Sequence, residues 1–188
     1  MIDIASIDRH VEQLFDTLSR LAAALRAAGV EYRVVGGMAV YLHVEERDPL
    51  AARLTRDIDV AIRRDDLARL AEAVLPFGFH YRHAAGVDML VDAQAPRSRS
   101  AVHFVFVREK VRAGYLEAVP EFSPPVEARD GVLLAPVADL LRMKLTSFRL
   151  KDRVHIQDLD AVGLITPEIE AALPAPLRAR LAEVRASE

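Results

Sequence analysis

The chain has 188 residues, of which 52% are hydrophobic and 28% charged, and its formal net charge is −3. This composition excludes a disordered or low-complexity chain, and the length suits a single domain. The absence of cysteine excludes disulfides, a thiolate nucleophile and a cysteine-ligated metal site. The longest apolar run, residues 34–42, is much shorter than the roughly 20 residues of a membrane span. The acidic N-terminal segment does not resemble a signal peptide. We therefore expect a cytoplasmic protein with no membrane partner.

Helices and strands are predicted to alternate over the first part of the chain. Helices show apolar residues three and four positions apart, whereas strands alternate apolar and polar residues or are rich in β-branched side chains. In chain order we expect a helix from a Ser6 cap to residue 28, a strand over 30–36, a helix over 37–46, a strand over 57–62, a helix over 65–75, and strands over 80–82, 87–92 and 101–108.

The second part of the chain is predicted to be mainly helical. Residues 120–130 contain three prolines, which cannot donate to a ladder, and read as an irregular or edge segment. A short strand over 131–134 precedes helices over 137–150, 153–162 and from residue 167 onward. This order predicts an α/β (α+β) fold with a mixed sheet. We expect one domain, with a sheet-containing core over 1–135 and C-terminal helices over 136–188.

Two short segments contain the densest chemistry of the chain. Asp57 and Asp59 are two residues apart on a predicted strand, so their side chains share one face. Adjacent carboxylates repel each other unless a cation compensates them, and Mg²⁺ bridging carboxylates to phosphates is the commonest case. Gly36 and Gly37 join a strand to a helix, where exposed N–H groups form a site for a triphosphate. Walker A and GxGxxG motifs are both absent.

Each motif also has a simpler explanation. A lone DxD sequence is usually a solvated strand edge, and a lone glycine pair is usually only a turn. Here the two motifs occur in the order strand, glycine pair, helix, loop and paired aspartates within residues 34–62. That combination favours a functional site.

The same order resembles the nucleotidyltransferase superfamily of the DNA polymerase β type. The closer resemblance is to AbiEii-type nucleotidyltransferase-like proteins, which are often toxins of toxin–antitoxin pairs. It rests on a first block, RLTRDID, and a second, KLTSFRLKDRVHIQDLDAVGL, and it covers most of residues 30–163. The matching residues are Arg53, Thr55, Asp57, Ile58 and Asp59 in the first block, and Lys144, Arg149, Lys151, Asp152, Asp158 and Asp160 in the second.

The resemblance implies a nucleotidyltransferase-like mixed sheet flanked by helices, and an activity. Asp57 and Asp59 would bind two Mg²⁺ (or Mn²⁺) ions, and the glycine pair would contact the triphosphate, with Arg53, Thr55 and Arg56 nearby. The reaction would transfer a nucleoside monophosphate from a nucleoside triphosphate to an acceptor and release pyrophosphate. Catalysis would consist mainly of positioning and of neutralising phosphoryl charge.

The chain departs from this pattern at the third acidic position of the superfamily. The matching string AVHFVFV places His103 there. A histidine ligates Mg²⁺ poorly, but it is suited to act as a general base for the acceptor hydroxyl. The substitution also fits a degenerate protein that binds nucleotide without turnover, or a histidine with no role. Asp88 is a further candidate carboxylate, if the register of its hairpin turns it toward Asp57.

A cationic segment near residue 150 supplies candidate phosphate ligands. Only three of the 25 basic residues are lysines, and Lys144 and Lys151 are two of them. Lysine is a compact point charge suited to a phosphate, so we expect Lys144 and Lys151 to bind the triphosphate, with Arg149 as an additional candidate. Alternatively, the run is a solvated cationic face. Asp152 and Asp158 are either site residues or structural partners of a lysine or arginine, and His155 reads as a supporting or surface residue.

Three functional hypotheses follow. The first is a Mg²⁺-dependent nucleotidyltransferase with an unidentified acceptor, for which RNA, tRNA and protein are candidates. A second cationic cluster consists of Arg97, Arg99, Arg108, Lys110 and Arg112, and it would favour an RNA or tRNA acceptor if both cationic clusters face one cleft. The second hypothesis is a nucleotide-binding module without turnover. The third is a component of a toxin–antitoxin pair, whose antitoxin partner covers the cleft.

Overall fold

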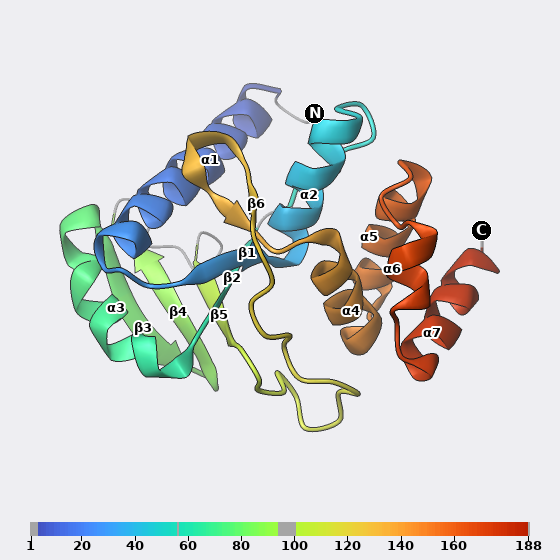
Figure 1. Ribbon diagram of the computed structural model, residues 1–188. Helices are drawn as coiled ribbons and strands as arrows, with labels where there is room; N and C mark the ends of the chain where they lie inside the picture. Colours follow the sequence, from blue (N-terminus) through green and yellow to red (C-terminus); the bar gives the residue numbers. More distant parts are fainter. Residues whose placement is uncertain (1–3, 56, 94–100, 188) are drawn as a thin grey trace.

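The protein is described by a computed structural model that covers residues 4–55, 57–93 and 101–187, with the backbone alone for residues 4–10. Seven strands form one mixed sheet in the order β3-β4-β5-β2-β1-β7-β6. Their bounds are β1 Tyr32–Val35, β2 Ile58–Ile62, β3 Phe79–Ala84, β4 Val87–Asp92, β5 Val102–Phe106, β6 Val126–Glu127 and β7 Leu133–Leu134. The predicted α/β class with a mixed sheet is confirmed (Figure 1).

The strand β2 occupies the centre of this sheet. It pairs antiparallel with β1 and parallel with β5, and the register places Asp59 beside Val35 on one side and beside His103 on the other. Antiparallel pairs join β3 to β4, β4 to β5 and β6 to β7, while β1 and β7 are parallel. The proline-rich segment contributes only β6, at the edge, as its composition predicts.

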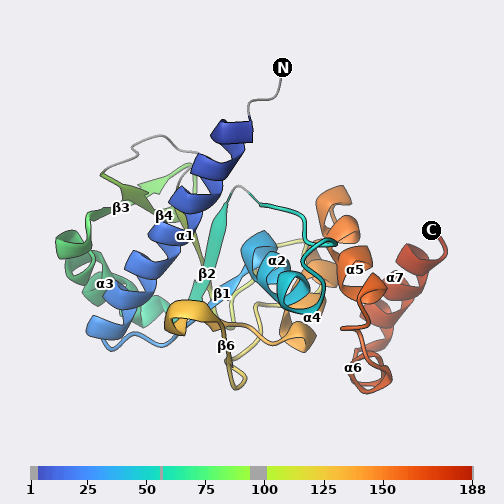
Figure 2. The same cartoon turned by 90° about the horizontal axis from the view of Figure 1, so that it is seen from above.

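The helices form two groups (Figures 1 and 2). One group, α1 Ile4–Ala27, α2 Gly36–Arg47 and α3 Leu67–Ala73, covers one face of the sheet, where the rings of Phe15 and Tyr41 join α1 to α2. The other group, α4 Val137–Ser147, α5 Leu150–Ala161, α6 Pro167–Ala171 and α7 Ala175–Arg185, gathers beside the sheet. Within the ranges given above, no helix combines the length and hydropathy that a bilayer span requires.

Two hydrophobic cores correspond to these groups. The larger core lies between the sheet and the first helices, and the smaller lies among α4, α5, α6 and α7. Helix α2 contributes to both, since Met38, Ala39 and Leu42 belong to the first core and Val40 and Val44 to the second. The N-terminal end of α2 is therefore held firmly between the two halves of the chain.

Several predicted boundaries are wrong, for local backbone reasons. The helix predicted to start at a Ser6 cap already begins at Ile4. The helix predicted over 137–150 ends at Ser147, because Phe148 adopts a left-handed conformation with φ of 51°. The predicted C-terminal helix is divided into α6 and α7 around Pro174, which lacks the N–H that a continuous helix needs.

Candidate active site

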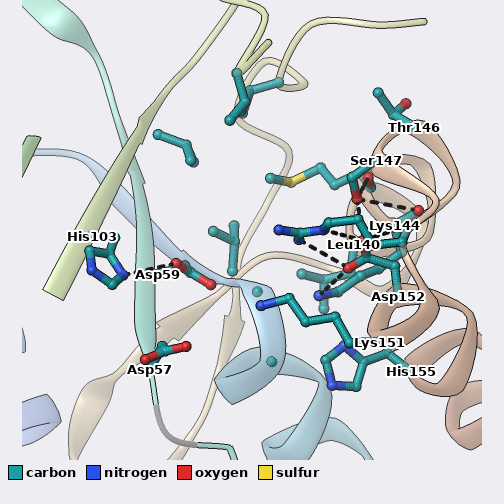
Figure 3. Close-up of a pocket in the computed structure, with 18 of the residues that line it drawn as sticks. Asp57, Asp59, His103, Leu140, Lys144, Thr146, Ser147, Lys151, Asp152 and His155 are labelled. Carbon is teal, nitrogen blue, oxygen red and sulfur yellow. Dashed lines mark hydrogen bonds and ion pairs between the residues drawn. The ribbon is translucent and has the colours of Figure 1, made fainter. Parts of the chain in front are cut away.

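A cavity of about 530 Å³ opens between the sheet and the second group of helices. Its walls are β2 and β5, the N-terminal end of α2, the helices α4 and α5, and the segment that follows β5. Figure 3 shows Asp57, Asp59 and His103 on the strand side of this cavity, opposite Lys144, Lys151 and Asp152 on the helical side.

The strand wall presents two carboxylates on one face. Asp59 lies in β2, and Asp57 is the residue just before that strand. Ile58 and Val60 point to the other face and are buried in the core. Because strand side chains alternate, burial of the isoleucine and valine turns both aspartates toward the cavity. Within the described chain, neither carboxylate pairs with a lysine or arginine. The predicted shared face is therefore present, and the described residues supply no lysine or arginine that pairs with the charges on it.

The glycine pair brings the start of α2 against these carboxylates. Gly36 has a φ of +70°, and a Cβ built on it would lie 2.0 Å from Asp59 Oδ2. A Cβ on Gly37 would lie 2.7 Å from Thr55 Oγ1, so both positions exclude a side chain. The N-cap residue Val35 offers no capping side chain to the first turn of α2. Free N–H groups at a helix N-terminus favour an anion.

His103 completes the strand wall. It is the register partner of Asp59 across β2 and β5, and its Nδ1 lies 3.7 Å from Asp59 Oδ1. Both side chains are about 30% exposed, at 29% and 32%. The interaction with Asp59 raises the pKa of His103 above its ordinary value, against the opposing effect of partial burial. The structure thus places the histidine beside the aspartate pair.

The helical wall contains a saturated ion cluster. Asp152 of α5 is fully buried; it accepts hydrogen bonds from Ser147 Oγ at 2.8 Å and from Arg149 Nε at 2.7 Å. Lys144 of α4 is 5% exposed, and its Nζ lies 3.3 Å from Asp152 Oδ1. Burial alone would raise the pKa of Asp152, but Arg149, Lys144 and Ser147 lower it to about 2. Burial lowers the pKa of Lys144, and the charge of Asp152 opposes that effect.

Two further side chains of α5 line the cavity. Lys151 is exposed and reaches toward the aspartate pair (Figure 3), and it makes no ion pair within the described chain. His155 lies one turn further along, close to Gly37, and its buried Nδ1 has no hydrogen-bond partner in the described part of the chain. Burial and the charge of Lys144 lower the pKa of His155 to about 4, so its imidazole is neutral at pH 7.

Several residues of this cavity, among them Ser147, are not identified from the sequence. The sequence also predicts a supporting or surface position for His155, whereas both residues line the cavity. The spacing of Lys151 and His155 contained a usable signal, because residues four apart share one helix face. The role of Ser147 depends on the turn at Phe148, which the helical pattern does not reveal.

Other predicted site residues lie elsewhere. Asp88 precedes Met89, the register partner of His103, so it points to the opposite face. There Tyr81 donates to it at 2.6 Å, and His83 Nδ1 lies 2.8 Å from the same oxygen. The structure therefore does not bring Asp88 to Asp57, because the register that the prediction required does not occur.

Of the second cationic cluster, Arg112 lines the cavity, whereas Arg108 pairs with Glu121. Arg53 is 69% exposed and its Nε donates to Asp158 Oδ1 at 2.8 Å, which ties the loop before β2 to α5. This contact links the two sequence blocks, although neither side chain lines the cavity. Burial raises the pKa of Asp158, against the effect of Arg53. Arg56, Arg97 and Arg99 lie outside the described residues.

Comparison with known proteins supports the fold. No protein-family model matches the chain, and no curated protein matches its sequence. The crystal structure of an antigenic nucleotidyltransferase-like protein from Paracoccidioides brasiliensis aligns with a TM-score of 0.60 at 18% identity, over 94% of this chain and 89% of that chain. This chain has the nucleotidyltransferase-like fold. The solution structure of the antibiotic-resistance factor ANT(2'')-Ia aligns with a TM-score of 0.46 at 13% identity, over 94% of this chain and 84% of that chain.

The nucleotidyltransferase-like fold of this chain brings three charge-bearing features to one cavity. These are the two carboxylates of the strand wall, the N–H groups at the start of α2, which the side chain of the N-cap residue does not cap, and the cationic side chains of α4 and α5. A polyanion carrying a divalent cation matches all three, because the anion faces the N–H groups and cations while the metal faces the carboxylates.

Proposed function

We propose that the protein is a Mg²⁺-dependent nucleotidyltransferase, which moves a nucleoside monophosphate from a nucleoside triphosphate to an acceptor hydroxyl and releases pyrophosphate. The observation that carries this proposal is the aspartate pair, Asp57 and Asp59, without a lysine or arginine partner in the described chain and opposite a cationic wall. The nucleotidyltransferase-like fold is consistent with it. The AbiEii-type relationship stays a prediction.

The residues of the strand wall fit a magnesium ion that is delivered with phosphates. Mg²⁺ takes oxygen ligands and is usually held by one or two carboxylates together with substrate phosphates. Asp57 and Asp59 supply such oxygens from one face of the strand. When bound there, the ion would neutralise phosphoryl charge and polarise the phosphate oxygens. His103 is a softer donor and is less suited to this metal.

The side chains around the pair have separate tasks in this proposal. The N–H groups at Gly36 and Gly37 hold phosphate oxygens, which the absence of a Cβ makes accessible. Lys144, Arg149 and Lys151 neutralise the triphosphate, and Asp152 fixes the first two of these cations. Because these groups are placed before the substrate arrives, the phosphoryl charge meets oriented charges instead of reorganising water.

The first test is ligand binding. At a nucleotide concentration of about 100 times Kd, the folded state should gain about 2.7 kcal/mol, which raises the melting temperature by roughly 5–10 °C. We expect this rise with Mg²⁺ and at least one nucleoside triphosphate, and its loss in the Asp57→Ala/Asp59→Ala double variant. No rise with any of the four nucleotides, in the presence of Mg²⁺ or Mn²⁺, would argue against a nucleotide site.

The second test is transfer. Wild-type protein is incubated with each α-labelled nucleoside triphosphate and total RNA or cellular protein, and labelled product and pyrophosphate are followed. Loss of a metal ligand removes several kcal/mol of transition-state stabilisation, so Asp59→Asn should slow transfer about 1,000-fold. His80→Asn, an exposed histidine outside the cavity, is the control. Full activity in Asp59→Asn would refute the proposed chemistry.

A second candidate function is nucleotide binding without turnover. The observation that favours it is His103, which occupies the strand position beside Asp59 and reduces the oxygen ligands there. In this case the wild type binds nucleotide but releases no pyrophosphate, and His103→Asp gains turnover. Turnover in the wild type would exclude it. A protein antitoxin that covers the cavity is a further proposal from the resemblance, and co-purification of a second small protein would support it.

A further inference from the structure

The face of the sheet that carries Asp59 continues beyond the cavity to the edge strand β3. The registers of four neighbouring strands place one residue of each side by side, in the order Asp59, His103, Met89 and Arg82. Directly paired residues of neighbouring strands project to the same face, so these four side chains form one row. Since strands lie about 4.8 Å apart, the row spans roughly 14 Å from Asp59 to the edge.

The two faces of the β3–β4 hairpin are covered differently. On the far face, Leu90 and Phe79 are fully buried, and Arg20 of α1 lies over the Phe79 ring at 4.8 Å. Figures 1 and 2 show this hairpin at the end of the sheet away from α4, α5, α6 and α7. On the face that carries Asp59, four side chains that are not buried form what we call the outer platform: Arg82, Val87, Met89 and Val91.

Arg82 gives the outer platform a permanent positive charge at the edge of the sheet. Among the residues that the structure describes, its guanidinium has no ion-pair or hydrogen-bond partner. Two other arginines near the hairpin are paired, Arg20 with Asp92 and Arg64 with Glu109. A guanidinium is well suited to bind a carboxylate. The outer platform therefore combines an aliphatic surface with one site for an acidic group.

The proposed transfer requires its acceptor on this side of Asp59. In phosphoryl transfer, the attacking and leaving oxygens lie roughly in line. Pyrophosphate leaves toward the cations of the helical wall, because they neutralise its charge. Figure 3 shows His103 on the side of Asp59 that faces away from Lys151. The attacking oxygen therefore arrives over β5, and the rest of its molecule extends toward Met89 and Arg82.

We propose that the acceptor is a protein, of which an extended segment crosses the outer platform and places an acidic side chain on Arg82. This inference rests on the proposed function and names its acceptor class. RNA binding without base readout uses cations along the backbone and aromatic rings for stacking. The outer platform has one arginine and three aliphatic or thioether side chains, and Tyr81 points to the opposite face. These groups suit a polypeptide.

The length of the row sets a spacing within the acceptor. An extended polypeptide advances about 3.3–3.6 Å per residue, so roughly 14 Å corresponds to about four residues. Residues i and i+4 of such a segment face the same side. We therefore expect the modified serine, threonine or tyrosine to lie four residues from an aspartate or glutamate.

The transfer to such a residue balances without a further reactant. The hydroxyl oxygen forms a bond to the α-phosphorus, and the bond from that phosphorus to the pyrophosphate oxygen breaks. Pyrophosphate leaves with the bonding electrons, and the hydroxyl proton passes to water.

The first experiment identifies the class of acceptor. The full chain is incubated in Mg²⁺ with each α-labelled nucleoside triphosphate and a cell extract that contains both protein and RNA. The products are then treated with protease or with ribonuclease. We expect the labelled product to be destroyed by protease and to survive ribonuclease. Label confined to material that ribonuclease destroys would overturn this inference, while the proposed function would stand.

Surface variants then test the outer platform. Arg82→Glu replaces an attraction for the acidic group by a repulsion, so protein labelling should fall about 10-fold. Met89→Asp should reduce it similarly, because it puts a charge on the aliphatic surface. Neither residue lines the cavity, so nucleotide affinity measured by calorimetry should not change. The matched control is His80→Asn, an exposed position two residues from Arg82 on the same face of β3, which should leave labelling and affinity unchanged.

A charge swap tests the contact with Arg82 directly. The labelled residue of the acceptor is mapped, and synthetic peptides of that sequence are made with the acidic residue four positions away or with lysine in its place. Lysine should slow labelling by the wild type and restore labelling by Arg82→Glu. Equal labelling of the two peptides by both proteins, or an acceptor without an acidic residue at that distance, would overturn the contact.

The outcomes separate this inference from the proposed function. Unchanged protein labelling in both Arg82→Glu and Met89→Asp would overturn the outer platform as the acceptor site and leave the triphosphate site intact. A wild-type protein that binds no nucleotide, or that binds it and labels nothing in the extract, would contradict the proposed transferase, and the acceptor assignment would fail with it.

Discussion

Asp59 and Asp152 lie on opposite walls of one cavity, and their surroundings differ in almost every respect. Asp152 is fully buried and bonded to Lys144, Arg149 and Ser147. Asp59 is about one-third exposed, and the one ion-pair partner that it has in the described chain is His103, whose Nδ1 lies 3.7 Å from Asp59 Oδ1. The helical wall therefore satisfies its carboxylate internally, whereas the described residues give the aspartates of the strand wall no lysine or arginine partner. The difference separates a carboxylate whose partners are all within the protein from one that the proposed function assigns to a bound metal ion.

The largest expected effect comes from removing the charge of the saturated carboxylate. Asp152→Ala leaves Lys144 buried without its partner, and loss of one member of a buried pair costs about 3–5 kcal/mol. The melting temperature should fall by roughly 6–20 °C. The free energy of unfolding of Asp59→Asn, measured in parallel by thermal and urea unfolding, should differ from that of the wild type by no more than about 0.5 kcal/mol. Equal destabilisation in both variants would remove the contrast between the walls.

The second effect concerns the glycine next to Asp59. Gly36→Ala combines a left-handed backbone with a Cβ placed on Asp59 Oδ2, so it should cost roughly 2–4 kcal/mol and displace the carboxylate. Gly29→Ala is the matched control, because Gly29 has a φ of +60° but open space around its Cβ. It should cost about 1–2 kcal/mol. Urea unfolding gives the loss of unfolding free energy for each variant. The difference between the two losses is the steric contribution of the Cβ at Gly36.

A third effect is the pH dependence that His155 introduces. Its pKa is about 4 in the folded protein and about 6.5 when unfolded, so the unfolded chain binds the proton more readily. Stability should therefore be fully present above pH 6.5 and fall as the pH decreases toward 4. His155→Asn should flatten this part of the profile. Unfolding followed between pH 7 and 4 tests this, and parallel profiles in the two proteins would contradict it.

The smallest effect is expected at the contact between the two sequence blocks. Arg53 is mostly exposed, so its ion pair with Asp158 is screened by water and contributes about 1 kcal/mol or less. Arg53→Ala should lower the melting temperature only slightly, and the difference should shrink further in 1 M salt. A fall in melting temperature as large as that of Asp152→Ala would mean that the ion pair between the loop and α5 is needed to hold the helical wall in place.

The sequence is informative about the strand wall because local rules determine it. Alternation along β2 places Asp57 and Asp59 on one face, and a glycine pair between a strand and a helix marks the start of α2. The position of His103 follows once β2 and β5 are neighbours, which the order of motifs suggests. Whether Asp88 lies on the same face of the sheet as Asp57 depends on the register of its hairpin, and the sequence does not determine that register.

The helical wall depends on features that periodicity does not report. The turn at Phe148 ends α4 early and lets Arg149 and Ser147 converge on Asp152. A charge run alone cannot distinguish this buried cluster from a solvated face. The contribution of the segment after β5 to the cavity is also invisible in the sequence, since Tyr115 and Met143 both line it but are 28 positions apart.

Helix α2 has a consequence for how the molecule unfolds. Because its opposite faces belong to the two hydrophobic cores, neither half can melt without exposing apolar surface on the helix that the other half uses. We therefore expect the sheet and the C-terminal helices to lose their structure in one cooperative step. A molecule bound at the first turn of α2 would then protect backbone amides from hydrogen exchange in both halves, far beyond the residues it touches.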